Sequence, residues 1–126
     1  MKLIIAGSRT FTDYEYMNKI LDEFKTMYSI EEVVCGMANG ADLLGNTWAK
    51  ENNIPIKEFP ANWNEYGKKA GFIRNIEMAK YGTCLIVFWD GISPGTKHMI
   101  NIAKKLKLIT YVFNYSQLKT GVNDEF

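Results

Sequence analysis

Residues 83–105 have the sequence TCLIVFWDGISPGTKHMINIAKK, in which an apolar run passes through a short glycine-containing turn into a helical pattern. The run 83–89 is hydrophobic almost without alternation, which is typical of a strand covered on both faces of a sheet. Met99, Ile100 and Ala103 then recur at helical spacing and indicate one apolar helix face. A buried strand that leads directly into a helix is part of a βαβ unit, so this stretch predicts an α/β fold with a parallel sheet.

The same alternation of strand and helix continues along the rest of the chain. Runs rich in β-forming residues occupy 2–7, 32–36, 54–59, 83–89 and 109–115. Apolar residues at three- and four-residue spacing predict helices over 14–28, 41–53 and 68–82, and a fourth helix whose apolar face is Met99, Ile100, Ala103 and Leu106. Five strands joined by right-handed crossovers give a doubly wound, mostly parallel sheet with helices on both faces. Thr12 or Asp13 is the expected N-cap of the first helix.

Length and composition indicate one domain. The chain has 126 residues, of which 47% are hydrophobic, and no linker or repeat divides it. The domain is expected to span 1–115, and 116–126 to form a C-terminal tail, because they carry no recognisable pattern. Cys35 and Cys84 lie inside apolar runs, which predicts buried free thiols rather than a disulfide or metal ligands. We therefore expect no metal and no cofactor.

Charge and hydropathy narrow the expected partners. Fifteen basic and fourteen acidic residues give a formal net charge of +1, which leaves no large electrostatic attraction for a nucleic-acid backbone. No apolar run approaches the roughly 20 residues of a membrane-spanning helix, and the first residues lack a signal-peptide pattern. A cytoplasmic protein that binds neither membrane nor nucleic acid is expected. The large side chains of Trp48, Trp63, Tyr66 and Phe72 exceed what a small domain readily buries, which predicts a homo-oligomer.

The segments that leave the predicted strands differ in chemistry from those that enter them. They read GSRTFTD (7–13), GMANGAD (36–42), PANWNEYGKKAG (60–71) and DGISPGT (90–96). Parallel sheets bind ligands beyond the carboxyl ends of their strands, where the strand order reverses. Glycine-containing turns, short polar side chains and a helix N-terminus at that edge are suited to an anion such as phosphate. An ordinary strand-to-helix turn capped by Ser93 or Thr96 is the alternative for the last segment.

Three stretches, 7–17, 36–82 and 87–105, together resemble the small single-domain YspA-like branch of the SLOG superfamily. The resemblance implies a Rossmann-like sheet of strand order 3-2-1-4-5 that binds nucleotides or nucleotide-derived ligands. It also implies kinship with the Lonely Guy phosphoribohydrolases and the DNA-processing protein A family. The hydrolase motifs match at Arg74, Met78, Gly95 and Thr96, but Lys97 and His98 follow where the hydrolases have a glutamate.

Residues at this predicted site fall into three chemical groups. The turns supply backbone donors, Arg9 and Arg74 could fork onto a phosphate, and Trp63 could stack a base, as could Tyr66 and Trp89. Surface salt bridges for the arginines and core or dimer packing for the aromatic residues are the alternatives. The predicted ligand-binding residues are Gly7, Ser8, Arg9, Gly36, Asn39, Gly40, Asp42, Trp63, Arg74, Asp90, Ser93, Gly95 and Thr96.

Hydrolysis of an N-glycosidic bond would need an acid in place of the missing glutamate, because positive charge develops on the ribose. Asp90 and Asp42 are the best placed candidates, ahead of Asp13 and Glu77. A turn for Asp90 and a helix start for Asp42 are the structural alternatives. The predicted catalytic residues are Arg74, Asp90 and His98, the last either an acid or base or a packing residue.

Two classes of function therefore follow from the sequence. The first is a binding module that senses or sequesters a nucleotide-derived signal, which the absent glutamate favours. The second is a nucleoside-phosphate N-glycosidic hydrolase. A DNA-associated module is a weaker third interpretation, because the net charge is close to zero.

Overall fold

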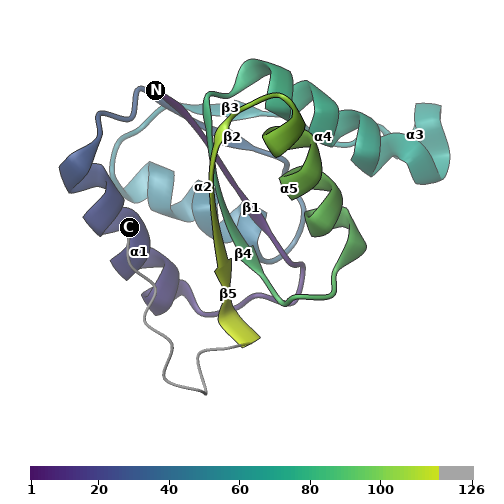
Figure 1. Cartoon of the computed structure of the whole chain (residues 1–126). Helices are drawn as coiled ribbons and strands as arrows, with labels where there is room; N and C mark the ends of the chain where they lie inside the picture. The colour runs from purple at the N-terminus through teal and green to yellow at the C-terminus, as the bar shows by residue number, and fades with distance from the viewer. Residues whose placement is uncertain (117–126) are drawn as a thin grey trace.

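The computed structural model describes residues 1–116, which form a single α/β unit (Figure 1). The strands are β1 (Lys2–Gly7), β2 (Glu32–Cys35), β3 (Ile56–Glu58), β4 (Cys84–Trp89) and β5 (Ile109–Asn114). All neighbouring pairs are parallel, and the strand order is β3-β2-β1-β4-β5. The predicted fold class and strand order are confirmed. The predicted tail from 117 onward lies outside the described residues.

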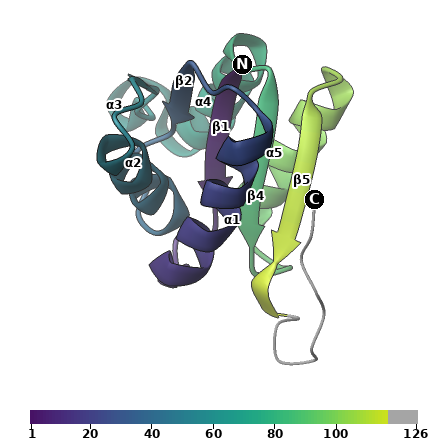
Figure 2. The same cartoon turned by 90° about the vertical axis from the view of Figure 1, so that its left-hand side faces the viewer.

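Four helices cover the sheet: α1 (Tyr14–Met27), α2 (Ala41–Glu51), α4 (Ala70–Tyr81) and α5 (Pro94–Lys105). Figure 1 shows the sheet nearly edge-on, with α1 and α2 on one side and α4 and α5 on the other. Figure 2 shows α1 crossing in front of the strands. The short helix α3 (Trp63–Tyr66) and the 3₁₀ turn η1 (Gly67–Lys69) were not predicted, because four residues are too few to show a helical period.

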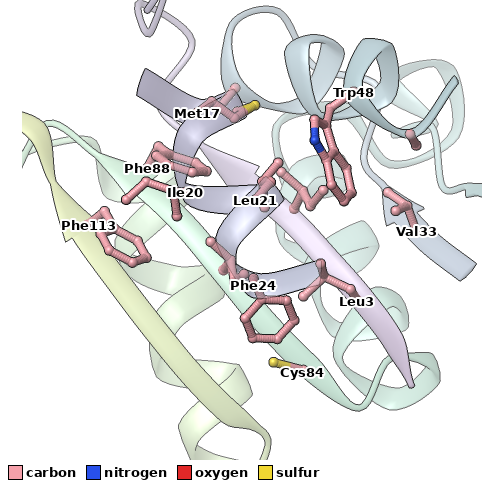
Figure 3. Packing of buried hydrophobic residues seen from close by; sticks show 14 of the residues in the cluster. Leu3, Met17, Ile20, Leu21, Phe24, Val33, Trp48, Cys84, Phe88 and Phe113 are labelled. Atoms are coloured by element: carbon pink, nitrogen blue, oxygen red, sulfur yellow. The ribbon is translucent and has the colours of Figure 1, made fainter. Parts of the chain in front are cut away.

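Alternation along β1 divides the core into two layers. Leu3 and Ile5 belong to the cluster under α1 and α2, and Ile4 and Ala6 belong to the cluster under α4 and α5. The side chains of α1, including Phe24, point onto the strands in the first layer (Figure 3). Because β1 is covered on both faces, its sequence has to be apolar throughout.

Several local predictions can be compared with the structure. Asp13, rather than Thr12, caps α1, because its side chain accepts a hydrogen bond from the Tyr16 N–H at 3.0 Å. Cys35 and Cys84 are buried free cysteines, as predicted. No helix among residues 1–116 is both long enough and apolar enough to cross a membrane.

Trp48 corrects part of the argument for self-association. We expected this tryptophan to be surplus to the core, but it is completely buried on the inner face of α2. Its Nε1 donates to Asp22 of α1 at 2.9 Å. The domain buries it by closing α2 against α1. Trp63, Tyr66 and Phe72 do remain exposed, by 50%, 42% and 45%.

Candidate functional site

A cleft of about 350 Å³ opens at the carboxyl edge of the sheet, between the loop after β1 and the first turns of α4 and α5. It lies where the strand order reverses between β1 and β4, as the switch-point rule predicts. The predicted residues that line it are Gly7, Arg9, Asp42, Trp63, Arg74, Ser93, Gly95 and Thr96. An adjoining recess of about 250 Å³ adds Gly36 and Asn39 and shares Arg9, Trp63 and Arg74 with the cleft. The structure therefore brings most of the predicted ligand-binding residues together.

Arg74 is the buried cation of the cleft. Its side chain extends from α4 toward the end of β2, where Nη1 donates to the carbonyl oxygen of Gly36. Nε donates to Oδ1 of Asn75 at 3.1 Å, and the residue is only 9% exposed. Burial lowers the pKa of Arg74, while the nearby Asp42 acts in the opposite direction. These two hydrogen bonds use two of the five guanidinium donors, so the group is held in place with donors left for a ligand in the cleft.

Asp42 faces the same cleft from the first turn of α2. It is 4% exposed, and its Oδ2 accepts a hydrogen bond from the Ala38 N–H at 3.2 Å. Burial raises the pKa of Asp42 to about 6, although Arg74 and the Ala38 N–H favour the charged form. Asp42 is thus an acid that changes its protonation state close to neutral pH, and it lines a cleft that also holds a guanidinium group.

Gly36 lets these two charged groups approach one another. A Cβ atom at this position would lie 2.7 Å from Oδ2 of Asp42 and 2.8 Å from Nη1 of Arg74. Both distances are shorter than any real Cβ contact, so the absence of a side chain is a requirement of the site. Gly36 therefore lines the recess and also sets the spacing of Asp42 and Arg74, which line the cleft.

Gly36→Ala is accordingly expected to separate Asp42 from Arg74. Overpacking of this kind costs about 1–3 kcal/mol of stability, and the displaced guanidinium should also bind an anionic ligand less well. Thermal unfolding and calorimetric titration of the same preparations measure the two effects. Wild-type stability together with wild-type binding would contradict this description of Gly36.

Aromatic side chains form one wall of the cleft. The guanidinium carbon of Arg9 lies 5.9 Å from the centre of the Trp63 ring, and a Cβ at Gly71 would touch that ring at 3.5 Å. Phe72 lines the cleft as well, although it was not predicted. Trp89 does not line it: its Nε1 donates to the Ser93 carbonyl oxygen at 3.2 Å, and its ring packs against the core cluster under α4 and α5. The predicted stacking role of Trp89 is replaced by a packing role.

Asp90 holds the turn that leads into α5. Its Oδ1 accepts hydrogen bonds from the N–H groups of Ile92 at 2.9 Å and Ser93 at 2.7 Å, and Oδ2 accepts from the Ser93 hydroxyl. Partial burial acts to raise the pKa of Asp90, but the hydrogen bonds from Ser93 and Ile92 outweigh it and lower the pKa. Asp90 does not line the cleft, so the structure gives it the turn role that the sequence left open, and its contact with a ligand stays a prediction.

Two further predicted residues support the loops without lining the cleft. Ser8 is buried, and its hydroxyl accepts from the Asp90 N–H at 3.0 Å, which ties the loop after β1 to the loop after β4. Gly40 has a φ of 78°, and a Cβ there would lie 2.4 Å from the Ser8 carbonyl oxygen. This turn therefore needs glycine, both for its backbone conformation and for its close approach to Ser8.

His98 packs against Phe72, which lines the cleft. Its Nδ1 is 3.1 Å from Nδ2 of Asn75, and its ring centre is 4.5 Å from that of Phe72. Burial lowers the pKa of His98. The ring does not line the cleft, so an acid or base role for it stays a prediction.

Sequence reasoning missed several residues of the cleft. They are Ala6, Thr10, Ala38, Lys68, Gly71, Phe72, Asn75, Pro94 and Met99. Lys68 and Gly71 lie in the segment 60–71, which was already assigned to the ligand edge, so that assignment could have found them. Asn75 follows Arg74 directly, but nothing in the sequence shows that its side chain turns toward α5. Among residues 1–116, no cluster of three or more His, Cys, Asp or Glu side chains could hold a metal ion.

A parallel doubly wound sheet with a ligand-sized cleft at its switch point defines a Rossmann-like domain. Residues 1–66 match the family model described as the YspA, cpYpsA-related SLOG family, and the chain belongs to this family. The chain is 36% identical over 113 residues to the Gene 61 protein of Mycobacterium phage D29. The aligned region covers 82% of this chain and 89% of that protein. No solved structure matches the chain.

Proposed function

We propose that this chain binds a nucleotide or a nucleotide-derived ligand in the cleft, and that it senses or sequesters that ligand. The observation that carries the proposal is the buried guanidinium of Arg74, held by Gly36 and Asn75 beside the first turn of α5. Membership of a SLOG family supports a nucleotide-related ligand. A phosphate would place a negative charge beside this buried cation.

The cleft is lined by two kinds of group, which suit the two parts of a nucleotide. The first-turn N–H groups of a helix have no partner within the helix, so those of Gly95 and Thr96 are available to phosphate oxygens. Ala6, Met78 and Met99 give the cleft an apolar floor, and Phe72 and Trp63 offer ring faces to a base. The proposed orientation therefore has phosphate at Arg74 and α5, and the base against the aromatic wall.

Calorimetric titration against nucleoside monophosphates, diphosphates and cyclic nucleotides tests this proposal. The matching nucleosides, which lack phosphate, are the control and should bind at least about tenfold more weakly, because the charge-assisted contacts are lost. If no nucleotide binds, or if nucleosides bind equally well, the proposed phosphate site is wrong.

Hydrolysis of an N-glycosidic bond is the second candidate function, and Asp42 is the observation that favours it. A carboxyl group with a pKa of about 6 could stabilise a developing oxocarbenium ion or deliver a proton to the leaving base. Chromatographic detection of released base from each nucleotide measures turnover directly. Asp42→Asn and Asp90→Asn compare the acid that lines the cleft with the acid favoured by the sequence, because only loss of the true acid should abolish turnover.

Gly95→Ala is expected to separate ligand binding from stability. Nothing lies within 4 Å of a Cβ placed at Gly95, so alanine fits, and it should stabilise the helix by about 0.5–1 kcal/mol. The same methyl group would occupy the space that a phosphate needs to reach the N–H groups of α5, and the expected loss of affinity is about tenfold. The melting temperature of the variant should thus rise while its affinity for the nucleotide falls. An unchanged affinity would place the phosphate elsewhere.

Self-association and a cytoplasmic location stay predictions. The exposed rings of Trp63, Tyr66 and Phe72 support a homo-oligomer, and light scattering at micromolar concentration tests it. A clean monomer mass would contradict the prediction. Nucleic acid remains an unexpected partner because the net charge is +1.

A further inference from the structure

Asn75 connects the cation of the cleft to helix α5. It is 5% exposed and follows Arg74 in α4. Its Oδ1 lies 3.1 Å from Nε of Arg74, while its Nδ2 lies 3.2 Å from the Gly95 carbonyl oxygen and 3.1 Å from Nδ1 of His98. One buried amide therefore contacts the guanidinium, the first turn of α5 and the histidine.

Donor and acceptor chemistry fixes the orientation of this amide. The Nε of an arginine can only donate, so the Asn75 atom that faces Arg74 has to be the oxygen. The nitrogen then has two hydrogens, one for the Gly95 carbonyl oxygen and one for Nδ1 of His98. The His98 ring must accept at Nδ1, and its neutral form therefore has its hydrogen on Nε2.

We propose that Asn75 is a positioning residue, which sets the guanidinium of Arg74 relative to the first turn of α5 and selects the Nε2–H tautomer of His98. The inference rests on the proposed function in one respect, namely that Arg74 and α5 hold the same anionic group. Two binding elements on separate helices contribute fully to one phosphate only when their spacing is fixed in advance. A single amide that bonds to both helices supplies that spacing.

The surroundings of His98 agree with an acceptor at Nδ1. The ring packs on α4 through Phe72 and Asn75, and on its own helix it is preceded by Lys97. A protonated ring would direct an N–H of Nδ1 at the amide hydrogens of Asn75, so the contact requires the neutral ring. Burial lowers the pKa of His98, which favours the same form.

The tautomer can be measured without any ligand or variant. His98 is the only histidine of the chain, so the imidazole ¹⁵N–¹H spectrum contains one ring. At a pH above the titration of that ring, a protonated Nε2 and an unprotonated Nδ1 are expected. A neutral ring with its hydrogen on Nδ1 would overturn the proposal.

Asn75→Asp tests the same arrangement with a variant of nearly equal shape. The carboxylate still accepts from Arg74, but it cannot donate to Gly95 or His98. It should instead stabilise protonated His98 and raise the titration midpoint by about one pH unit or more. Asn101→Asp is the matched control, because it adds the same charge at an exposed position on α5, one turn from His98, and should shift the midpoint much less.

Binding of adenosine 5′-monophosphate and of inorganic phosphate completes the test. Asn75→Asp should bind both at least about tenfold more weakly than wild type, and Asn75→Ala should be weakened as well, while Asn101→Asp binds within about twofold. Wild-type binding that persists in both folded Asn75 variants would overturn the positioning role. If the wild-type protein binds neither these probes nor any other nucleotide of the calorimetric panel, the proposed function fails instead, and the tautomer still decides the orientation of the amide.

Discussion

Replacing Arg74 by alanine is expected to weaken binding of a nucleoside monophosphate by about tenfold to a hundredfold, equal to about 1.5–3 kcal/mol. Arg74 is buried, held by Gly36 and Asn75, and lines both the cleft and the recess beside it. A cation with this degree of burial is poorly screened by water, so its pairing with a phosphate is strong. Calorimetric titration of the variant at constant salt gives the ratio of dissociation constants.

Two further variants make this result specific. Arg74→Lys retains a charge but loses the planar fork, so its affinity should lie between those of wild type and Arg74→Ala. Arg9→Ala removes an arginine that lines the same cleft but is exposed, and its effect should be smaller, because exposed pairs contribute only about 0–1 kcal/mol. Equal losses from Arg9→Ala and Arg74→Ala would contradict the importance given to burial.

The fold could be predicted from the sequence because a strand buried on both faces of a parallel sheet is apolar at every position. The run 83–89 and the run 2–7 are apolar throughout, and in the structure they form the neighbouring strands β4 and β1. The strand order cannot be predicted from hydrophobic periodicity. It was predicted from the resemblance to the SLOG superfamily. The helix α3 could not be predicted, because its four residues have no buried face and therefore no apolar pattern.

The site was predicted as a region more accurately than as a set of roles. Glycine and polar residues after the strands marked the edge at which the cleft opens, and Arg9, Asp42 and Arg74 do line that cleft. The roles depend on contacts between residues far apart in the chain, such as Gly36 and Arg74, which are separated by 38 positions in the sequence. Asp90 and Asp42 are equivalent in sequence terms, but the first is bonded to its own turn and the second is buried facing a guanidinium.

Asp42 should also leave a measurable signature in the stability of the protein. Its pKa is about 6 in the folded chain, against an ordinary value of 3.8. A carboxyl group whose pKa is raised by folding contributes stability below its unfolded pKa and loses it as the pH rises through the folded pKa. Full ionisation of Asp42 should therefore cost about 3 kcal/mol, since each pKa unit corresponds to about 1.4 kcal/mol. About 2 kcal/mol of this cost should appear between pH 4.5 and pH 7.5.

Asp42→Asn is expected to remove this decline, because the amide retains an oxygen that can accept from the Ala38 N–H but never becomes charged. Urea unfolding at pH 4.5 and pH 7.5 measures the difference, and the variant should gain stability relative to wild type at the higher pH. Asp90→Asn is the control, since folding lowers the pKa of Asp90 below its ordinary value of 3.8 and its contribution changes only at lower pH. This variant should therefore keep the wild-type decline between pH 4.5 and pH 7.5. If Asp42→Asn follows the wild-type pH dependence, Asp42 does not titrate near neutral pH and cannot be the proton donor of the hydrolase function.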